Sequence, residues 1–175
     1  GSNFENKYYP NISGVARSLN FYPIGSEKAE EGIVNIAFGL GKTVVDGGVS
    51  LRFSPYHPKK VIQLSNPGSA LKGTQKKFYA LDMNSRELVP DAEDGGNLRY
   101  LDIEEAENDN SMQMLASTYD FENNRLRGGT ARKGKRVLTF SSILKYSMFP
   151  LAKIIKTILE MGENSMNVPI EIEFA

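Results

Sequence analysis

The feature that most constrains the fold is a short apolar run followed by a cluster of glycines. Residues 33–38 read Ile-Val-Asn-Ile-Ala-Phe, a β-branched run typical of a buried strand. Gly39 and Gly41 follow the run at once, and Gly47 and Gly48 come shortly after. Because glycine adopts backbone conformations closed to other residues, the pattern predicts a strand that ends in a sharp corner.

A cationic side chain lies in this glycine corner. Lys42 follows Gly41, and its ammonium group and the loop N–H groups together suit an anion such as a phosphate. A plain turn explains the same glycines, and this alternative stays open. The Gly-Lys-Thr sequence also resembles the end of a P-loop, but Ile36 stands where that motif requires its first glycine. The pattern therefore excludes a P-loop nucleotidase.

The last residues of the chain alternate between apolar and acidic side chains. Ile170, Ile172 and Phe174 fall on one face of a predicted strand, and Glu171 and Glu173 fall on the other. At a rise of about 3.3 Å per residue, the two glutamates lie about 7 Å apart. Carboxylates at this spacing can hold Mg²⁺ beside phosphate oxygens, although a strand that simply faces solvent has the same pattern.

Composition excludes several classes of site. The 21 Lys and Arg residues balance the 21 Asp and Glu residues, so no net charge recruits nucleic acid or an anionic membrane. The sequence has no cysteine, which excludes disulfides and thiolate metal sites. No apolar stretch reaches the roughly 18 residues of a membrane span. We expect a soluble cytoplasmic protein without nucleic-acid or membrane partners, and we interpret Gly1 and Ser2 as the remnant of a cleaved tag.

The expected fold class is α+β, with a mixed or antiparallel sheet and a few helices. The apolar patterns predict strands at 13–22, 33–38, 49–53, 61–64, 77–81, 98–103, 118–121 and 170–174. We expect an irregular lead-in over residues 3–11, one helical turn at 43–45 and a short helix from Ser141 or Ser142 through Tyr146.

The clearest helix begins at Pro150 and is predicted to stop at Gly162. Its apolar residues recur at helical spacing and form one stripe. The stripe comprises Leu151, Ile154, Ile155, Ile158 and Leu159.

Residues 65–136 differ from the rest and are predicted to be a β-rich insertion in a domain that spans residues 3–175. Residues 91–110 hold eight acidic side chains and one basic one, and residues 127–136 hold five basic side chains and no acid. Both stretches are typical of solvated loops. A basic loop that folds over a polyphosphate is the functional alternative, whereas its lack of aromatic residues argues against single-stranded nucleic acid.

Three pieces of the chain resemble, in order, the nucleotide-binding domain of phosphoenolpyruvate synthase and pyruvate phosphate dikinase. The first is Ser-Gly-Val at 13–15. The second is Gly-Leu-Gly-Lys-Thr-Val-Val-Asp-Gly at 39–47, where the family has Gly-Leu-Gly-Glu-x-Val-Val-x-Gly. The third is Pro-Ile-Glu-Ile-Glu-Phe-Ala at 169–175, where the family has Pro-x-Asp-Ile-Glu-Trp/Phe-Ala. The resemblance covers residues 12–64 and 137–175.

This resemblance implies an ATP-grasp fold that binds ATP and Mg²⁺. Glu173 matches the family's Mg²⁺-binding carboxylate, and Glu171 stands where the family commonly has aspartate. The nucleotide-binding residues implied are Gly39, Leu40, Gly41 and Lys42, with the difference that Lys42 replaces a glutamate. The parent reaction converts ATP and pyruvate to phosphoenolpyruvate, AMP and phosphate through a phosphohistidine on another domain.

The same resemblance implies that the isolated chain is inactive. The family's upstream lysine and arginine, its Gln-x-Arg segment, its phosphohistidine domain and its pyruvate-binding barrel have no counterpart here, so we assign no catalytic residue. The chain is expected to be a fragment of its parent. The alternative is a non-catalytic ATP-grasp-derived module that senses a ligand or contacts another protein.

Overall fold

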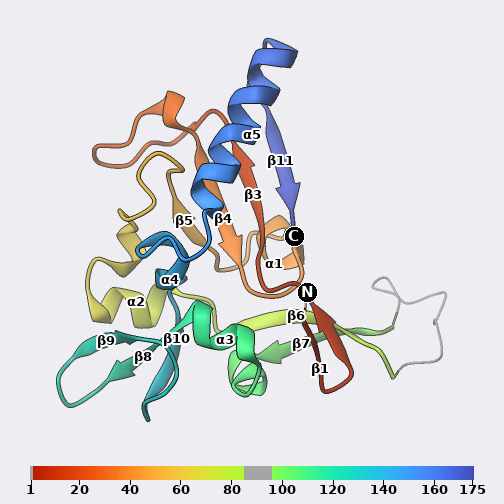
Figure 1. Ribbon diagram of the computed structural model, residues 1–175, viewed down its shortest axis with the longest axis vertical. Helices are drawn as coiled ribbons and strands as arrows, with labels where there is room; N and C mark the ends of the chain where they lie inside the picture. Colours follow the sequence, from red (N-terminus) through yellow and green to blue (C-terminus); the bar gives the residue numbers. More distant parts are fainter. Residues whose placement is uncertain (1, 85–95) are drawn as a thin grey trace.

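The computed structural model describes residues 2–84 and 96–175, and these residues form three antiparallel sheets and several helices (Figure 1). The central sheet has the order β11 (Glu171–Phe174), β3 (Ser13–Arg17), β4 (Ile33–Ala37) and β5 (Leu51–Phe53). The N-terminal sheet has the order β1 (Ser2–Phe4), β2 (Lys7–Tyr9), β6 (Lys77–Asp82) and β7 (Leu98–Asp102). The three-stranded sheet has the order β10 (Lys135–Leu138), β8 (Ala116–Asp120) and β9 (Arg125–Gly128).

The helices are short apart from the last one. They are α1 (Lys42–Val45), α2 (Pro67–Gly73), α3 (Asn110–Leu115), α4 (Ser141–Leu144) and α5 (Leu151–Met166), with 3-10 turns η1 (Ala29–Glu31), η2 (Ile62–Leu64) and η3 (Ile103–Ala106). This arrangement confirms the predicted α+β class. Among the described residues, no helix has the length and apolar character needed to cross a membrane.

Helix α5 packs along the central sheet and supplies much of its apolar cover (Figure 1). The predicted stripe is narrower in the structure, because Ile154 and Ile158 are 40% and 45% exposed. The predicted stop at Gly162 is wrong: the helix continues to Met166 and ends at Asn167, whose φ is 55°. Gly162 instead faces Ile170, where a side chain would collide.

Two further sequence predictions are wrong. Residues 61–64 are not a strand, because Ile62–Leu64 forms a 3-10 turn. Residues 3–11 are not an irregular lead-in, because they contain the β1–β2 hairpin. Its turn residues, Glu5 and Asn6, both have positive φ, as a type I′ turn requires, but they lack the Asn-Gly signal of that turn. Of the acidic stretch at 91–110, predicted to be a solvated loop, residues 91–95 lie outside the described residues.

The core joins the central sheet to the segment predicted as an insertion. Tyr9, Phe38 and Phe78 form an aromatic cluster with ring centroids 4.8 to 5.2 Å apart. Phe38 ends the buried run of the central sheet, whereas Phe78 belongs to β6. The described parts of residues 65–136 therefore share a continuous core with the rest of the chain.

The basic stretch at 127–136 is anchored to the fold at its end. The Arg136 side chain is almost fully buried and donates hydrogen bonds to the Glu107 carboxylate, the Thr118 hydroxyl and the Arg132 carbonyl. Glu107 comes from the acidic stretch, so one opposite-charge pair joins the two stretches. Arg136 thus has a structural role in holding β10 against β8.

A second ion pair fixes the outer edge of the central sheet. The Arg52 guanidinium donates two hydrogen bonds to the Glu27 carboxylate, both of 2.8 Å. Burial of Glu27 opposes its ionisation, but the bonds from Arg52, from the Ile24 amide and from Asn20 hold the pKa of this carboxyl below its ordinary value of 4.5. Glu27 is therefore a stabilising anion at neutral pH.

We expect this pair to make stability dependent on acid pH. Because the folded-state pKa of Glu27 is lowered, its contribution is complete above pH 4.5 and is lost as the pH falls through the lowered value. Glu27→Gln should reduce the free energy of unfolding by about 1.5–3 kcal/mol at pH 7, and by less at pH 3. Urea unfolding at both pH values measures this, with the exposed Glu30→Gln as control. Equal losses at both pH values would contradict the assignment.

The Ser-Gly-Val segment also gives a stability prediction. A Cβ added at Gly14 would lie 2.5 Å from the Asn35 carbonyl oxygen and 2.6 Å from the Phe174 ring. Gly14→Ala should therefore lower the free energy of unfolding by about 2–4 kcal/mol, because β3 is central and its backbone neighbours are fixed. Gly128→Ala is the matched control, since nothing lies within 4 Å of its Cβ position. Similar urea midpoints for the two variants would contradict this packing.

Candidate functional site

The open face of the central sheet carries both of the predicted glutamates. Glu173 pairs across the sheet with Val15, and Val15 pairs in turn with Asn35. Glu171 pairs with Arg17 in the next row. Directly opposed residues in antiparallel strands share a face, so these side chains lie together. Ile170, Ile172 and Phe174 pack against the core, which confirms the predicted alternation.

A cleft of about 390 Å³ lies over this face, and we call it the polar cleft. Its walls come from the strands β11, β3 and β4 and from the turn that ends α1. The lining residues are Val15, Arg17, Asn35, Val44, Val45, Gly47, Gly48, Ser50, Glu171 and Glu173. The structure thus brings the predicted glutamate strand and the segment after the glycine corner to one place, near the end of β11 (Figure 1).

The two glutamates differ in whether their carboxylates form an ion pair. Glu171 forms an ion pair with the Arg17 guanidinium, and both side chains are 46% exposed. Glu173 is also exposed, but it makes no hydrogen bond or ion pair with any residue that the structure describes. The negative charge of Glu173 is therefore the uncompensated one in the polar cleft.

The oxygen atoms of the polar cleft suit a hard cation that keeps part of its water. Besides Glu173, the lining offers the amide oxygen of Asn35 and the hydroxyl of Ser50. Within residues 2–84 and 96–175, no group of three or more His, Cys, Asp or Glu side chains is placed to hold a metal. One or two carboxylates completed by water and phosphate oxygens is the usual environment of Mg²⁺, and the side chains here fit it.

The first residues of the glycine corner, Gly39 to Lys42, lie outside the polar cleft. Gly39 and Leu40 donate their amides to the carbonyls of Pro10 and Tyr79, at 3.2 and 2.9 Å. The Lys42 ammonium lies 3.1 Å from the Asp46 carboxylate. None of the four predicted nucleotide-binding residues, Gly39 to Lys42, lines the cleft.

The shape of the corner has a structural cause. Gly39 has a φ of +87°, and a Cβ there would lie 2.7 Å from the Tyr79 carbonyl oxygen, so the glycine lets β6 approach. The next amides, from Thr43 to Gly48, donate to carbonyls within the corner itself. Residues 44, 45, 47 and 48 of the corner form one wall of the cleft. Most of the amides in the corner already donate hydrogen bonds to protein carbonyls.

Three polar residues of the cleft were not identified from the sequence. Arg17 ends β3, and Asn35 is the single polar residue within the apolar run of β4. Ser50 precedes β5. An amide in the middle of a buried run is a usable signal, since it indicates that one face of the strand meets polar groups. Only the strand register shows that these residues face Glu171 and Glu173.

Comparison of the chain with family models, with curated proteins and with solved structures gives no significant match.

Proposed function

We propose that the polar cleft binds Mg²⁺ together with the phosphates of ATP, as part of one subdomain of an ATP-grasp, phosphoenolpyruvate synthase-like phosphotransferase. The observation that carries the proposal is the unpaired carboxylate of Glu173 in a cleft lined by three segments that resemble that family. The parent protein would transfer a phosphoryl group from ATP to a histidine on another domain and then to pyruvate, giving phosphoenolpyruvate.

The charges in the cleft support this assignment. Glu173, Asn35 and Ser50 offer oxygen ligands to the cation, which in turn neutralises charge on the phosphates. The Nε atom of Arg17 donates to the Glu171 carboxylate. The two terminal nitrogens of Arg17 make no hydrogen bond to a described residue. A guanidinium in this state can donate to phosphate oxygens while it keeps its ion pair.

The second candidate is a non-catalytic module that binds a ligand or a protein. Two observations favour it. The Glu171 carboxylate is already engaged by Arg17, so the cleft has one unpaired carboxylate where the resemblance implies two. The amides of Gly39 and Leu40 donate to the protein backbone and are unavailable to phosphate oxygens. Binding of ATP without dependence on Mg²⁺ would favour this module.

Calorimetric titration with ATP, with and without Mg²⁺, tests the proposal on the chain described here. Glu173→Gln keeps the size of the side chain and removes its charge, so Mg²⁺-dependent affinity should fall about 10-fold or more. Glu122→Gln removes an exposed carboxylate from the β8–β9 turn and should leave affinity unchanged.

The variant Glu171→Gln distinguishes the contribution of Glu171 to Mg²⁺-dependent ATP binding from that of Glu173. Because Arg17 already neutralises Glu171, the variant should change the Mg²⁺-dependent affinity less than about threefold. If Glu173→Gln and Glu122→Gln bind Mg²⁺-ATP equally, the metal site is not at Glu173. If the unmodified chain shows no binding, the polar cleft is not a nucleotide site and the module becomes the better description.

A further inference from the structure

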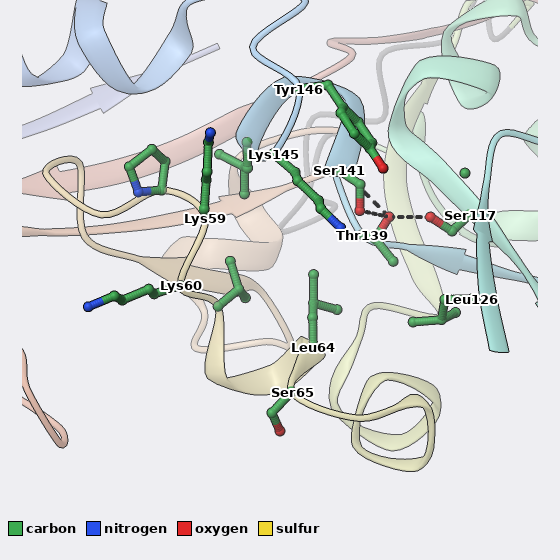
Figure 2. Close-up of a pocket in the computed structure, with 14 residues that line it drawn as sticks. Lys59, Lys60, Leu64, Ser65, Ser117, Leu126, Thr139, Ser141, Lys145 and Tyr146 are labelled. Atoms are coloured by element: carbon green, nitrogen blue, oxygen red, sulfur yellow. Dashed lines mark hydrogen bonds between the residues drawn. The ribbon is translucent and has the colours of Figure 1, made fainter. Parts of the chain in front are cut away.

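A second cleft, separate from the polar cleft, lies between the 58–65 segment, the three-stranded sheet and α4 (Figure 2). We call it the lysine cleft, and its volume is about 440 Å³. The residues that line it are Pro58, Lys59, Lys60, Val61, Leu64, Ser65, Ser117, Leu126, Gly128, Thr139, Ser141, Leu144, Lys145 and Tyr146. It shares no lining residue with the polar cleft.

The charge of the lysine cleft has one sign. Lys59, Lys60 and Lys145 line it, and no acidic side chain does. None of the three lysines forms an ion pair with a carboxylate of the described residues. Figure 2 shows Lys145 directed inward toward Thr139, whereas Lys59 and Lys60 point outward at the rim. The field inside the cleft therefore attracts an anion.

Three hydroxyl groups at the inner end of the cleft form a chain with a surplus proton. Thr139 Oγ1 lies 2.6 Å from Ser117 Oγ and 2.9 Å from Ser141 Oγ (Figure 2). These two contacts use two of the three hydroxyl protons, whichever way each bond runs. No other described group accepts from these hydroxyls, so one proton remains for an acceptor. Ser117 and Thr139 are 2% and 1% exposed, so the packing around them holds these two side chains in place.

The backbone next to these hydroxyls is strained. Phe140, between Thr139 and Ser141, has a φ of 50°, although it is a bulky residue that is 1% exposed. Such a conformation costs about 1–3 kcal/mol and persists only where the surrounding structure enforces it. The hydrogen bond of 2.8 Å from the Phe140 amide to the Leu115 carbonyl helps to do so. On either side of Phe140, the hydroxyls of Thr139 and Ser141 face each other at 2.9 Å.

The remaining wall is apolar. It is lined by Val61, Leu64, Leu126 and Leu144. Figure 2 shows Leu64 and Leu126 on the far side of the cleft from Tyr146. A ligand that fits both parts has an anionic head and an apolar body. The head meets Lys145 and the surplus hydroxyl proton, and the body covers the leucines.

We propose that the lysine cleft binds a phosphate monoester with an apolar or aromatic body. A phosphate offers several acceptor oxygens to the ammonium of Lys145 and to the hydroxyl chain, and its dianion gains from the rim lysines. The acceptor-only head group can accept the remaining hydroxyl proton as well as bonds from Lys145. The proposal does not rest on a nucleotide at the polar cleft.

Titration with phenyl phosphate in the presence of a chelator tests the proposal, with amide NMR shifts as the readout. Phenol and inorganic phosphate carry the two halves of this probe separately, and each should bind at least about 10-fold more weakly than phenyl phosphate. The shifts should centre on Ser117, Thr139 and Lys145. The amides of Arg17, Asn35 and Glu173 should not shift, which separates this site from the polar cleft.

A matched pair of lysine variants completes the test. Lys145→Gln should weaken phenyl phosphate binding about 10-fold, because it removes the inward charge. Lys153→Gln, an exposed lysine of α5 outside the cleft, should bind normally. Thermal unfolding shows that both variants fold. Equal affinity in the two variants overturns the proposal, as does an absence of shifts at millimolar phenyl phosphate or equal binding of phenol.

Discussion

The pairing of the last strand with the first strand of the central sheet is the interaction on which the polar cleft depends. Glu171 and Arg17 are 154 residues apart in the sequence, and only the β11–β3 ladder brings them together. Gly14 permits that ladder, because a side chain there would collide with Phe174 and with the Asn35 carbonyl. The register then places Glu173 in one row with Val15 and Asn35, and the position of the unpaired carboxylate follows.

The glycine corner depends on a second contact, with the N-terminal sheet. Leu40 donates to the Tyr79 carbonyl, and Gly39 leaves room for that strand, so the corner is held by β6. Phe38 joins Tyr9 and Phe78 directly beneath it. The described parts of the predicted insertion therefore support the wall of the polar cleft. Both clefts lie on one connected framework, yet their chemistry differs: one presents an anion, the other cations and a hydroxyl donor.

Local patterns in the sequence predicted the α+β class, the helical turn of α1 and the alternation of β11. They also predicted the strands of the central sheet, but the one predicted over 13–22 ends at Arg17. The same patterns failed to predict the end of a helix and a hairpin turn, where tertiary contacts override the local signal. Gly162 lies inside α5, where Ile170 occupies the space of a side chain, and the Glu5–Asn6 turn lacks its usual residues. The polar cleft was predicted through its glutamates only, since Arg17, Asn35 and Ser50 join it by register. The lysine cleft combines four separate segments, which no local pattern links.

Paramagnetic NMR can locate a divalent cation bound in the polar cleft. Mn²⁺ replaces Mg²⁺ at oxygen-rich sites and broadens the signals of nearby amides. With ATP present, we expect selective broadening at Glu173, Asn35 and Ser50, while Thr139 and Lys145 keep sharp signals. Broadening centred elsewhere, or spread evenly over the acidic surface, would contradict the assignment of the polar cleft as a metal–nucleotide site.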